Sequence, residues 1–152
     1  MKHLIFLASL ILLAGCPANV QQQAAQASLN ASVVVKNAQV AEKAAAVQGL
    51  ISSSDDKFIQ QQFDTIGQIG LTVDNCISAA SNRAGTISCL STAVTNLDTI
   101  YTNGGLYLKS ATALNDFNVA VSGVRSVLAG IEATLGGTVP PLPAQANAGG
   151  AQ

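Results

Sequence analysis

The feature that most constrains the fold is the spacing of apolar residues, which alternates between three and four positions along most of the chain. Steps of three and four return a side chain to the same face of an α-helix, so each stretch with this spacing predicts a helix with one apolar face. Breaks rich in serine, asparagine or glycine separate four such stretches. We therefore expect helices over residues 20–50, 55–82, 86–102 and 106–135.

The first expected helix differs from the others because alanine dominates its apolar seam. Small side chains let a neighbouring helix approach closely, although each one buries little apolar area. A seam of this kind predicts a tight helix contact, either inside the bundle or with another chain as in a coiled coil. The seam residues are Val20, Ala24, Ala27, Ala31, Val34, Ala38, Ala41 and Ala45.

Local signals set the expected ends of the helices and of the folded part. Ser53 and Asp56 have the spacing of a capping box at the start of the second helix. The run Asn103-Gly104-Gly105 is typical of a left-handed helix end, so we expect the third helix to be short. After Gly136, the composition rich in Pro, Ala and Gly predicts a disordered tail over residues 137–152.

Helical patterns joined by short turns, with no convincing strand pattern, define the fold class. We expect an all-α protein, an up-down antiparallel bundle of three to four helices. Because the third helix is expected to be short, the bundle would contain three long helices and one of half length.

The N-terminus has the organisation of an export signal. A short basic start, Met1-Lys2-His3, precedes ten residues without charge, Leu4–Leu13. A membrane-spanning helix needs about 20 apolar residues, so a run of this length is typical of a secretory signal instead. The small residues Ala14 and Gly15 follow, and then Cys16.

Leu13-Ala14-Gly15-Cys16 resembles the lipobox of bacterial lipoproteins, some of which plasmids or phages encode. The resemblance implies cleavage after Gly15, attachment of a diacylglycerol to the thiol of Cys16, and acylation of the new N-terminus with a fatty acid such as palmitate. Two or three acyl chains hold a protein stably on a membrane. The expected organisation is a signal peptide (1–15), a lipidated N-terminus and tether (16–23), a helical bundle (24–136) and the tail (137–152).

The residue after the lipidated cysteine bears on location. In the enterobacterial sorting rule, an Asp at this position retains a lipoprotein in the inner membrane, whereas this chain has Pro17. The resemblance therefore implies a membrane-anchored protein that faces the periplasm, with the outer membrane favoured.

Two further cysteines, Cys76 and Cys89, lie at equal distances from the expected turn at residues 82–85. In an antiparallel helix hairpin such residues face each other, and export brings them into an oxidising compartment. We expect a Cys76–Cys89 disulfide, and the alternatives are two buried free thiols or a metal site.

Composition excludes several classes of function. The only histidine is His3, so the mature chain lacks imidazole for Ser-His-Asp or Cys-His catalysis and for histidine-containing zinc sites. The mature chain has six basic and eight acidic side chains, a net charge of −2, which gives no electrostatic footprint for nucleic acid. We expect no catalytic, cofactor or metal site.

The expected function is a structural or protein-interaction role in the cell envelope, held to the membrane by lipid. The partner would be another envelope protein, or a second copy bound through the alanine-rich helix. Accessory, exclusion and lysis lipoproteins of secretion systems, plasmids and phages are of this kind. The alternative is a binding module for a hydrophobic ligand or lipid, with space left at Gly67, Gly70, Gly123 and Gly130.

Overall fold

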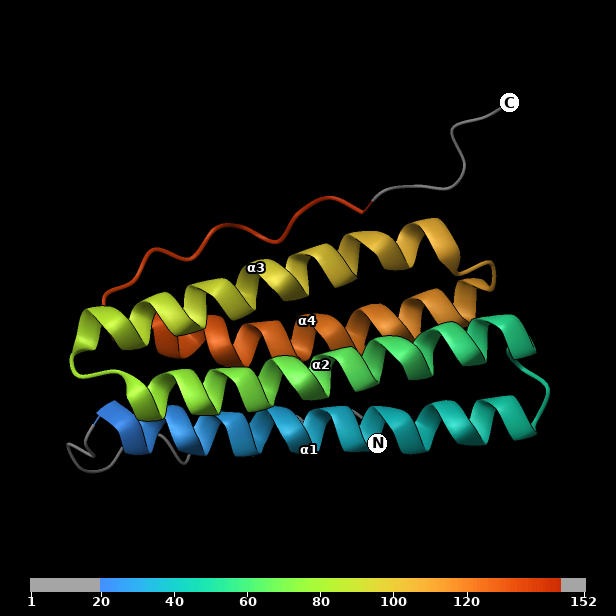
Figure 1. The fold of residues 1–152 in the computed structure, drawn as a ribbon. Helices are drawn as coiled ribbons and strands as arrows, with labels where there is room; N and C mark the ends of the chain where they lie inside the picture. Colours follow the sequence, from blue (N-terminus) through green and yellow to red (C-terminus); the bar gives the residue numbers. More distant parts are fainter. Residues whose placement is uncertain (1–19, 146–152) are drawn as a thin grey trace, which may run out of the picture.

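The computed structural model describes residues 20–145, which form four α-helices followed by an irregular segment (Figure 1). The helices are α1 (Val20–Val47), α2 (Ser53–Ala79), α3 (Arg83–Tyr107) and α4 (Ala111–Thr134). Short turns join them, so successive helices run in opposite directions (Figure 1). The expected all-α, up-down antiparallel bundle is confirmed.

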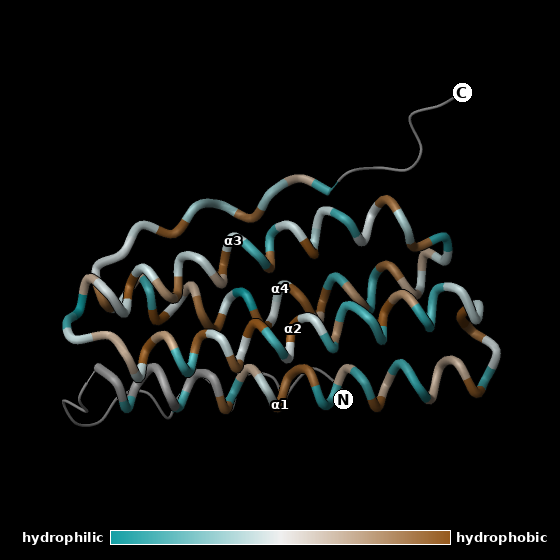
Figure 2. The backbone as a smooth tube through the Cα atoms, in the orientation of Figure 1, coloured by the Kyte–Doolittle hydropathy of each residue, from teal (hydrophilic) through white to brown (hydrophobic). Residues whose placement is uncertain are grey.

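The four helices are arranged in a square around one apolar core. Helix α1 packs against α2 and α4, and α3 packs against the same two helices from the other side. Apolar segments recur along every helix, as the three-four spacing requires (Figure 2). Each large apolar side chain buried in such a core contributes about 1.5–3 kcal/mol. The most deeply buried of them are Ile59, Phe63, Leu90, Val94, Leu97, Phe117 and Val121.

The alanine-rich seam of α1 faces the inside of the bundle over its described part. Ala31 belongs to the buried core, and Val34, Ala38 and Ala45 pack against it half-buried. Ala41 is exposed at the edge of this face. The seam therefore packs within the bundle, but the contact is not tight along its whole length, because Ala38, Ala41 and Ala45 also line a cavity. The side chains of the earlier seam positions, Val20, Ala24 and Ala27, lie outside the described residues.

The junction between α1 and α2 is shifted relative to the expected boundaries. Helix α1 ends three residues earlier than expected, because Gly49 adopts a left-handed conformation with φ of 70° and reverses the chain. The cap of α2 is Ser52 rather than Ser53. The Ser52 hydroxyl accepts a hydrogen bond from the backbone N–H of Asp55 at 3.1 Å, so the helix cap lies one residue earlier than expected.

The expectation of a short third helix was wrong. Helix α3 continues through Gly104 and Gly105 to Tyr107, so all four helices have similar lengths of 28, 27, 25 and 24 residues. A Cβ at Gly104 would lie 2.5 Å from the ring of Phe117 on α4. This glycine therefore allows a close helix contact and does not end the helix.

The segment after α4 is irregular but has specific contacts. Gly136, with φ of 77°, ends the helix, and the chain then turns back along α3 (Figure 1). Arg125 donates a hydrogen bond to the carbonyl of Pro140 at 2.7 Å, Asn118 pairs with Gln145, and Val139 packs against the core. We expected a disordered tail over residues 137–152. Residues 137–145 lack secondary structure, yet these contacts hold them on the bundle, and residues 146–152 lie outside the described range.

Within residues 20–145, none of the helices combines the length and apolar character that crossing a membrane requires. The expected signal peptide, Cys16 and most of the tether precede the described residues. Lipid attachment at Cys16 thus stays a prediction.

Candidate functional site

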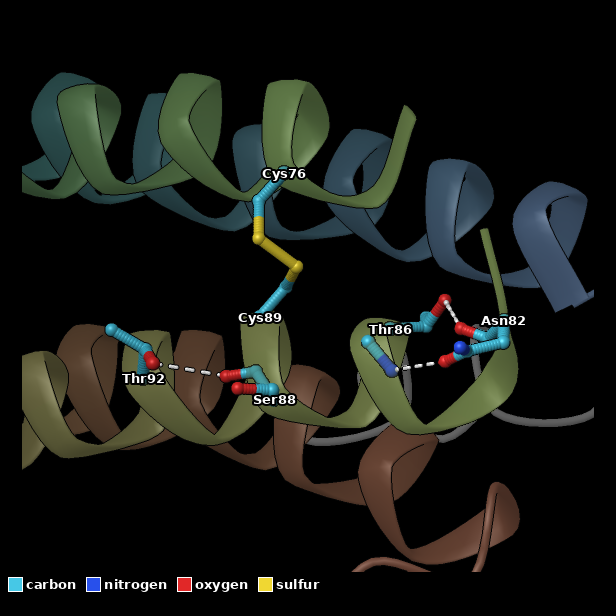
Figure 3. Close-up of a disulfide and its surroundings, with 7 residues drawn as sticks. Cys76, Asn82, Thr86, Ser88, Cys89 and Thr92 are labelled. Atoms are coloured by element: carbon cyan, nitrogen blue, oxygen red, sulfur yellow. Dashed lines mark hydrogen bonds between the residues drawn. A yellow bond between two sulfur atoms is a disulfide. The ribbon is translucent and has the colours of Figure 1, made fainter. Parts of the chain in front are cut away.

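The two predicted bridging cysteines meet between α2 and α3. Cys76 and Cys89 form a disulfide with a Cα–Cα distance of 5.8 Å (Figure 3). Cys89 is buried, whereas Cys76 is exposed on the outer side of α2. In the chain-entropy model a bridge that closes a loop of this size contributes about 3 kcal/mol. The bridge has the pairing that the sequence predicted, and its role is to clamp the α2–α3 hairpin.

A shallow groove of about 470 Å³ runs beside this disulfide between α2 and α3. Three threonines line it, and their hydroxyls donate to carbonyls one turn earlier in their own helices, as for Thr92 and Ser88 in Figure 3. Of the described residues that line the groove, none is charged. The groove therefore offers little chemistry by which to recognise a ligand.

Helix α1 carries more exposed large apolar side chains than any other helix in the described range. Val33, Val40 and Val47 recur every seven residues and are 57, 65 and 89% exposed. Leu29 precedes them on the same face, and Lys36 and Lys43 lie between them at steps of three and four. We call these six residues the outer stripe. Isolated exposed apolar residues are normal, but a stripe at heptad spacing is the pattern that a partner helix recognises.

Buried charges on the α3–α4 side of the bundle are paired. Arg125 is buried and forms an ion pair with Asp98, and the same guanidinium holds the carbonyl of Pro140. The network joins α3, α4 and the C-terminal segment. Its groups satisfy one another, which is the usual condition for a buried charge with a structural role.

Asp55 is a second buried acid with partners. It is 2% exposed, and its carboxylate oxygens accept hydrogen bonds from the backbone N–H groups of Lys109 and Ser110, both at 3.2 Å. Since these N–H groups precede α4, the carboxylate joins the start of α2 to the α3–α4 turn. Asp55 is therefore a structural residue.

Glu42 on α1 is buried in a different way. It is 6% exposed, and neither carboxyl oxygen has a partner at good hydrogen-bond geometry in the described part of the bundle. Burial raises the pKa of Glu42 from 4.5 to about 8, the Asp56 carboxyl group raises it further through a side-chain hydrogen-bond interaction and through its charge, and Lys43 lowers it. The side chain is thus largely protonated at neutral pH.

Glu132 on α4 is intermediate between these cases. It is 1% exposed, and burial raises its pKa, while a hydrogen bond with Ser91 and the charge of Arg125 lower it. One of its oxygens, Oε2, has no hydrogen-bond partner among the described residues. Glu132 is therefore partly satisfied, through Ser91.

Glu42 was not among the residues predicted from the sequence, although the sequence holds a signal for it. Glu42 is the one acidic residue between Val20 and Val47, and it follows Ala38 by four positions and precedes Ala45 by three. The helical period thus places it on the inner face of α1.

The part of the chain that the structure describes contains no group of three or more His, Cys, Asp or Glu side chains that could hold a metal ion. Comparison of the chain with protein-family models, with curated proteins and with solved structures gave no match. The outer stripe and Glu42 are the two features of the described bundle for which its packing gives no account.

Proposed function

We propose that the chain is a lipid-anchored, non-catalytic protein of the cell envelope that binds a partner protein through the outer stripe of α1. The lipobox supports the anchor. Helix α1 begins four residues after Cys16. Four extended residues span at most about 14 Å, so the N-terminal end of α1 would lie close to the membrane surface. The compartment we propose is the periplasmic side of a membrane, with the outer membrane favoured by Pro17.

The observation that carries the interaction role is the outer stripe itself. From Leu29 to Val47 it follows α1 for about 27 Å, at a rise of 1.5 Å per residue. Its apolar side chains lie in one row, which suits an amphipathic helix laid alongside. Helix α1 packs against α2 and α4, and the disulfide clamps α2 to α3, so this face rests on a braced bundle.

Charge complementarity points to an acidic partner rather than a second copy. Lys36 and Lys43 are the charged residues of the outer stripe, and the one acid of α1, Glu42, is buried. Two copies paired through this face would bring four ammonium groups to one interface, which disfavours self-association. We therefore propose that the partner is an envelope protein with an amphipathic helix that presents acidic side chains.

Site-specific photo-crosslinking in intact cells tests this function. A photoreactive residue at Val40 should form an adduct with one envelope protein, while the same residue at Leu71, which is 58% exposed on α2, serves as the control. Charge reversal by Lys36→Glu with Lys43→Glu should remove the adduct, and the matching acid-to-lysine change in the partner helix should restore it.

Three results would contradict the proposal. One is equal labelling from Val40 and Leu71, which would show that the outer stripe is not selective. Another is a homodimer as the main adduct, which would establish self-association. The third is an adduct that survives charge reversal, which would exclude an acidic partner.

A further inference from the structure

An open cavity of about 290 Å³ lies between α1, α2 and α4. Large apolar side chains form its floor, chiefly Ile59, Phe63 and Phe117, with the two phenylalanine ring centroids 6.3 Å apart. Alanines of α1 and α4, including Ala38 and Ala120, form its walls. The space exists because these side chains end at Cβ, so a larger residue would fill it.

The cavity is not where the sequence suggested space for a ligand. A Cβ added at Gly67, Gly70 or Gly130 would have no heavy atom within 4 Å, since those positions face open space. At Gly123 a Cβ would meet Val34 at 3.4 Å, which is ordinary contact. The alanine-rich seam of α1, rather than the glycines, creates the cavity.

Glu42 lines this cavity, and the bundle supplies its carboxyl oxygens with no well-placed hydrogen bond, only with the neighbouring acid Asp56. Leaving a buried polar group without a hydrogen bond costs about 1–3 kcal/mol. Asp55 and Arg125, with similar burial, avoid this cost through partners in the bundle. A glutamate has three rotatable side-chain bonds, so its carboxyl group can turn toward a molecule in the cavity.

The surroundings of Glu42 are acidic. Asp116 on α4 lies at the mouth of the cavity, and Asp56 on α2 acts on Glu42 directly. Lys43 on α1 is the basic group that also acts on Glu42, and among the described residues that line the cavity there is no Lys or Arg. Such a site repels a carboxylate and attracts a cation.

We propose that this cavity binds a small apolar amine, whose ammonium group pairs with the carboxylate of Glu42 while its apolar body packs against Phe63 and Phe117. Aromatic faces add attraction for a cation. The volume is at the lower end of the range for small-molecule pockets, which suits one short chain or one ring rather than a whole lipid.

The protonation state of Glu42 gives this binding a distinct signature. The raised pKa keeps the proton on the free carboxyl group at neutral pH. An ammonium ion beside it favours the ionised form, so binding of the amine releases this proton to solvent. Affinity for the amine should therefore increase as pH rises toward 8.

Calorimetric titration of the full-length mature protein in lipid nanodiscs, with empty nanodiscs subtracted, tests the proposal. The probes are 2-phenylethylamine, the neutral 2-phenylethanol and the anionic 3-phenylpropanoate. We expect the amine to bind roughly tenfold more tightly than the alcohol, with proton release, because a charged hydrogen bond contributes more than a neutral one. The anion should bind most weakly.

Three variants separate the parts of the proposal. Glu42→Gln keeps the shape of the side chain, so it should retain binding of the alcohol and lose the preference for the amine. Ala38→Leu should fill the cavity and abolish binding of both. Asp64→Asn removes an exposed acid of α2 outside the cavity and should change neither. Equal affinity for amine and alcohol, an amine preference that survives Glu42→Gln, or no binding of any probe would overturn the proposal.

Discussion

Arg125 and Glu42 are equally buried, each 6% exposed, but they differ in the hydrogen-bond partners that the bundle gives them. Arg125 reaches two other segments, through Asp98 of α3 and the carbonyl of Pro140. Glu42 has no well-placed hydrogen-bond partner in the described part of the chain, and the side chain that acts on it most is another acid, Asp56. Burial alone therefore does not distinguish a structural charge from a candidate binding group. The presence or absence of a partner does, because an unsatisfied group keeps its interaction available for a ligand.

The largest predicted effect on stability comes from breaking the ion pair between Arg125 and Asp98. Arg125→Met should leave the Asp98 carboxylate without its partner and release the Pro140 carbonyl. Breaking such a pair typically costs about 3–5 kcal/mol, and partial exposure of Asp98 favours the lower value. Urea unfolding measures this loss, and limited proteolysis should show faster cleavage within residues 138–145. A loss under about 1 kcal/mol would mean that the network is not structural.

The disulfide is the next largest contribution, and it lies away from both buried charges. Replacing Cys76 and Cys89 by serine should lower the free energy of unfolding by about 3 kcal/mol. The pH dependence of stability should stay as in the wild type, since neither cysteine takes part in the hydrogen bonds of Arg125 or lines the cavity around Glu42. A changed pH dependence would show that the clamp also positions the buried charges.

Because of Glu42, the free energy of unfolding should decrease as the pH rises. The pKa of Glu42 is about 8 in the folded chain and near 4.5 when unfolded, so between these values the folded state binds the extra proton. Stability is therefore unaffected below about pH 4.5, falls by at most about 1.4 kcal/mol per pH unit between 4.5 and 8, and stays at the lower level above.

Glu42→Gln sharpens this test. The variant should be about 1–3 kcal/mol more stable than the wild type at pH 8, because it removes the cost of a buried carboxylate. Part of the pH dependence should remain, since burial also raises the pKa of Glu132. The double variant with Glu132→Gln should flatten the urea-unfolding profile further. A wild-type stability that increases between pH 5 and 8 would contradict both assignments.

The smallest effect on stability is expected at the outer stripe. Val40 is 65% exposed, so Val40→Ser should change the free energy of unfolding by less than about 0.5 kcal/mol. The same substitution should weaken capture of the partner protein in a pull-down from solubilised membranes. If Val40→Ser lowers the free energy of unfolding by more than about 1 kcal/mol, this face stabilises the bundle itself.

Helix positions and the disulfide could be predicted because they depend on signals close together in the chain. The three-four spacing found all four helices, although the fourth begins at Ala111 rather than at residue 106, and the symmetry of Cys76 and Cys89 about one turn placed the bridge. Gly104 misled the prediction because its neighbour Phe117 is distant in sequence, so a packing glycine looked like a helix end. The hydrogen bond from Arg125 to the carbonyl of Pro140 is likewise a contact between separate segments, so local sequence signals did not predict it.

For Glu42, the sequence predicts the position of the side chain but not its surroundings. Its position on the inner face of α1 follows from the helical period, but the absence of a partner depends on what α2 and α4 place around it. The outer stripe is different, since its valines at positions 33, 40 and 47 are visible beside the alanine seam in the sequence alone.

The most direct test of a lipid-anchored bundle is the intact mass of the protein extracted from membranes, measured with and without reduction. We predict a chain that begins at Cys16, carries two or three acyl chains and gains two hydrogens when the Cys76–Cys89 bridge is reduced. The Cys16→Ala variant should carry no acyl chain. An unmodified mass with a free thiol at Cys16 would contradict the anchor, and with it the proposed place of the bundle at the membrane surface.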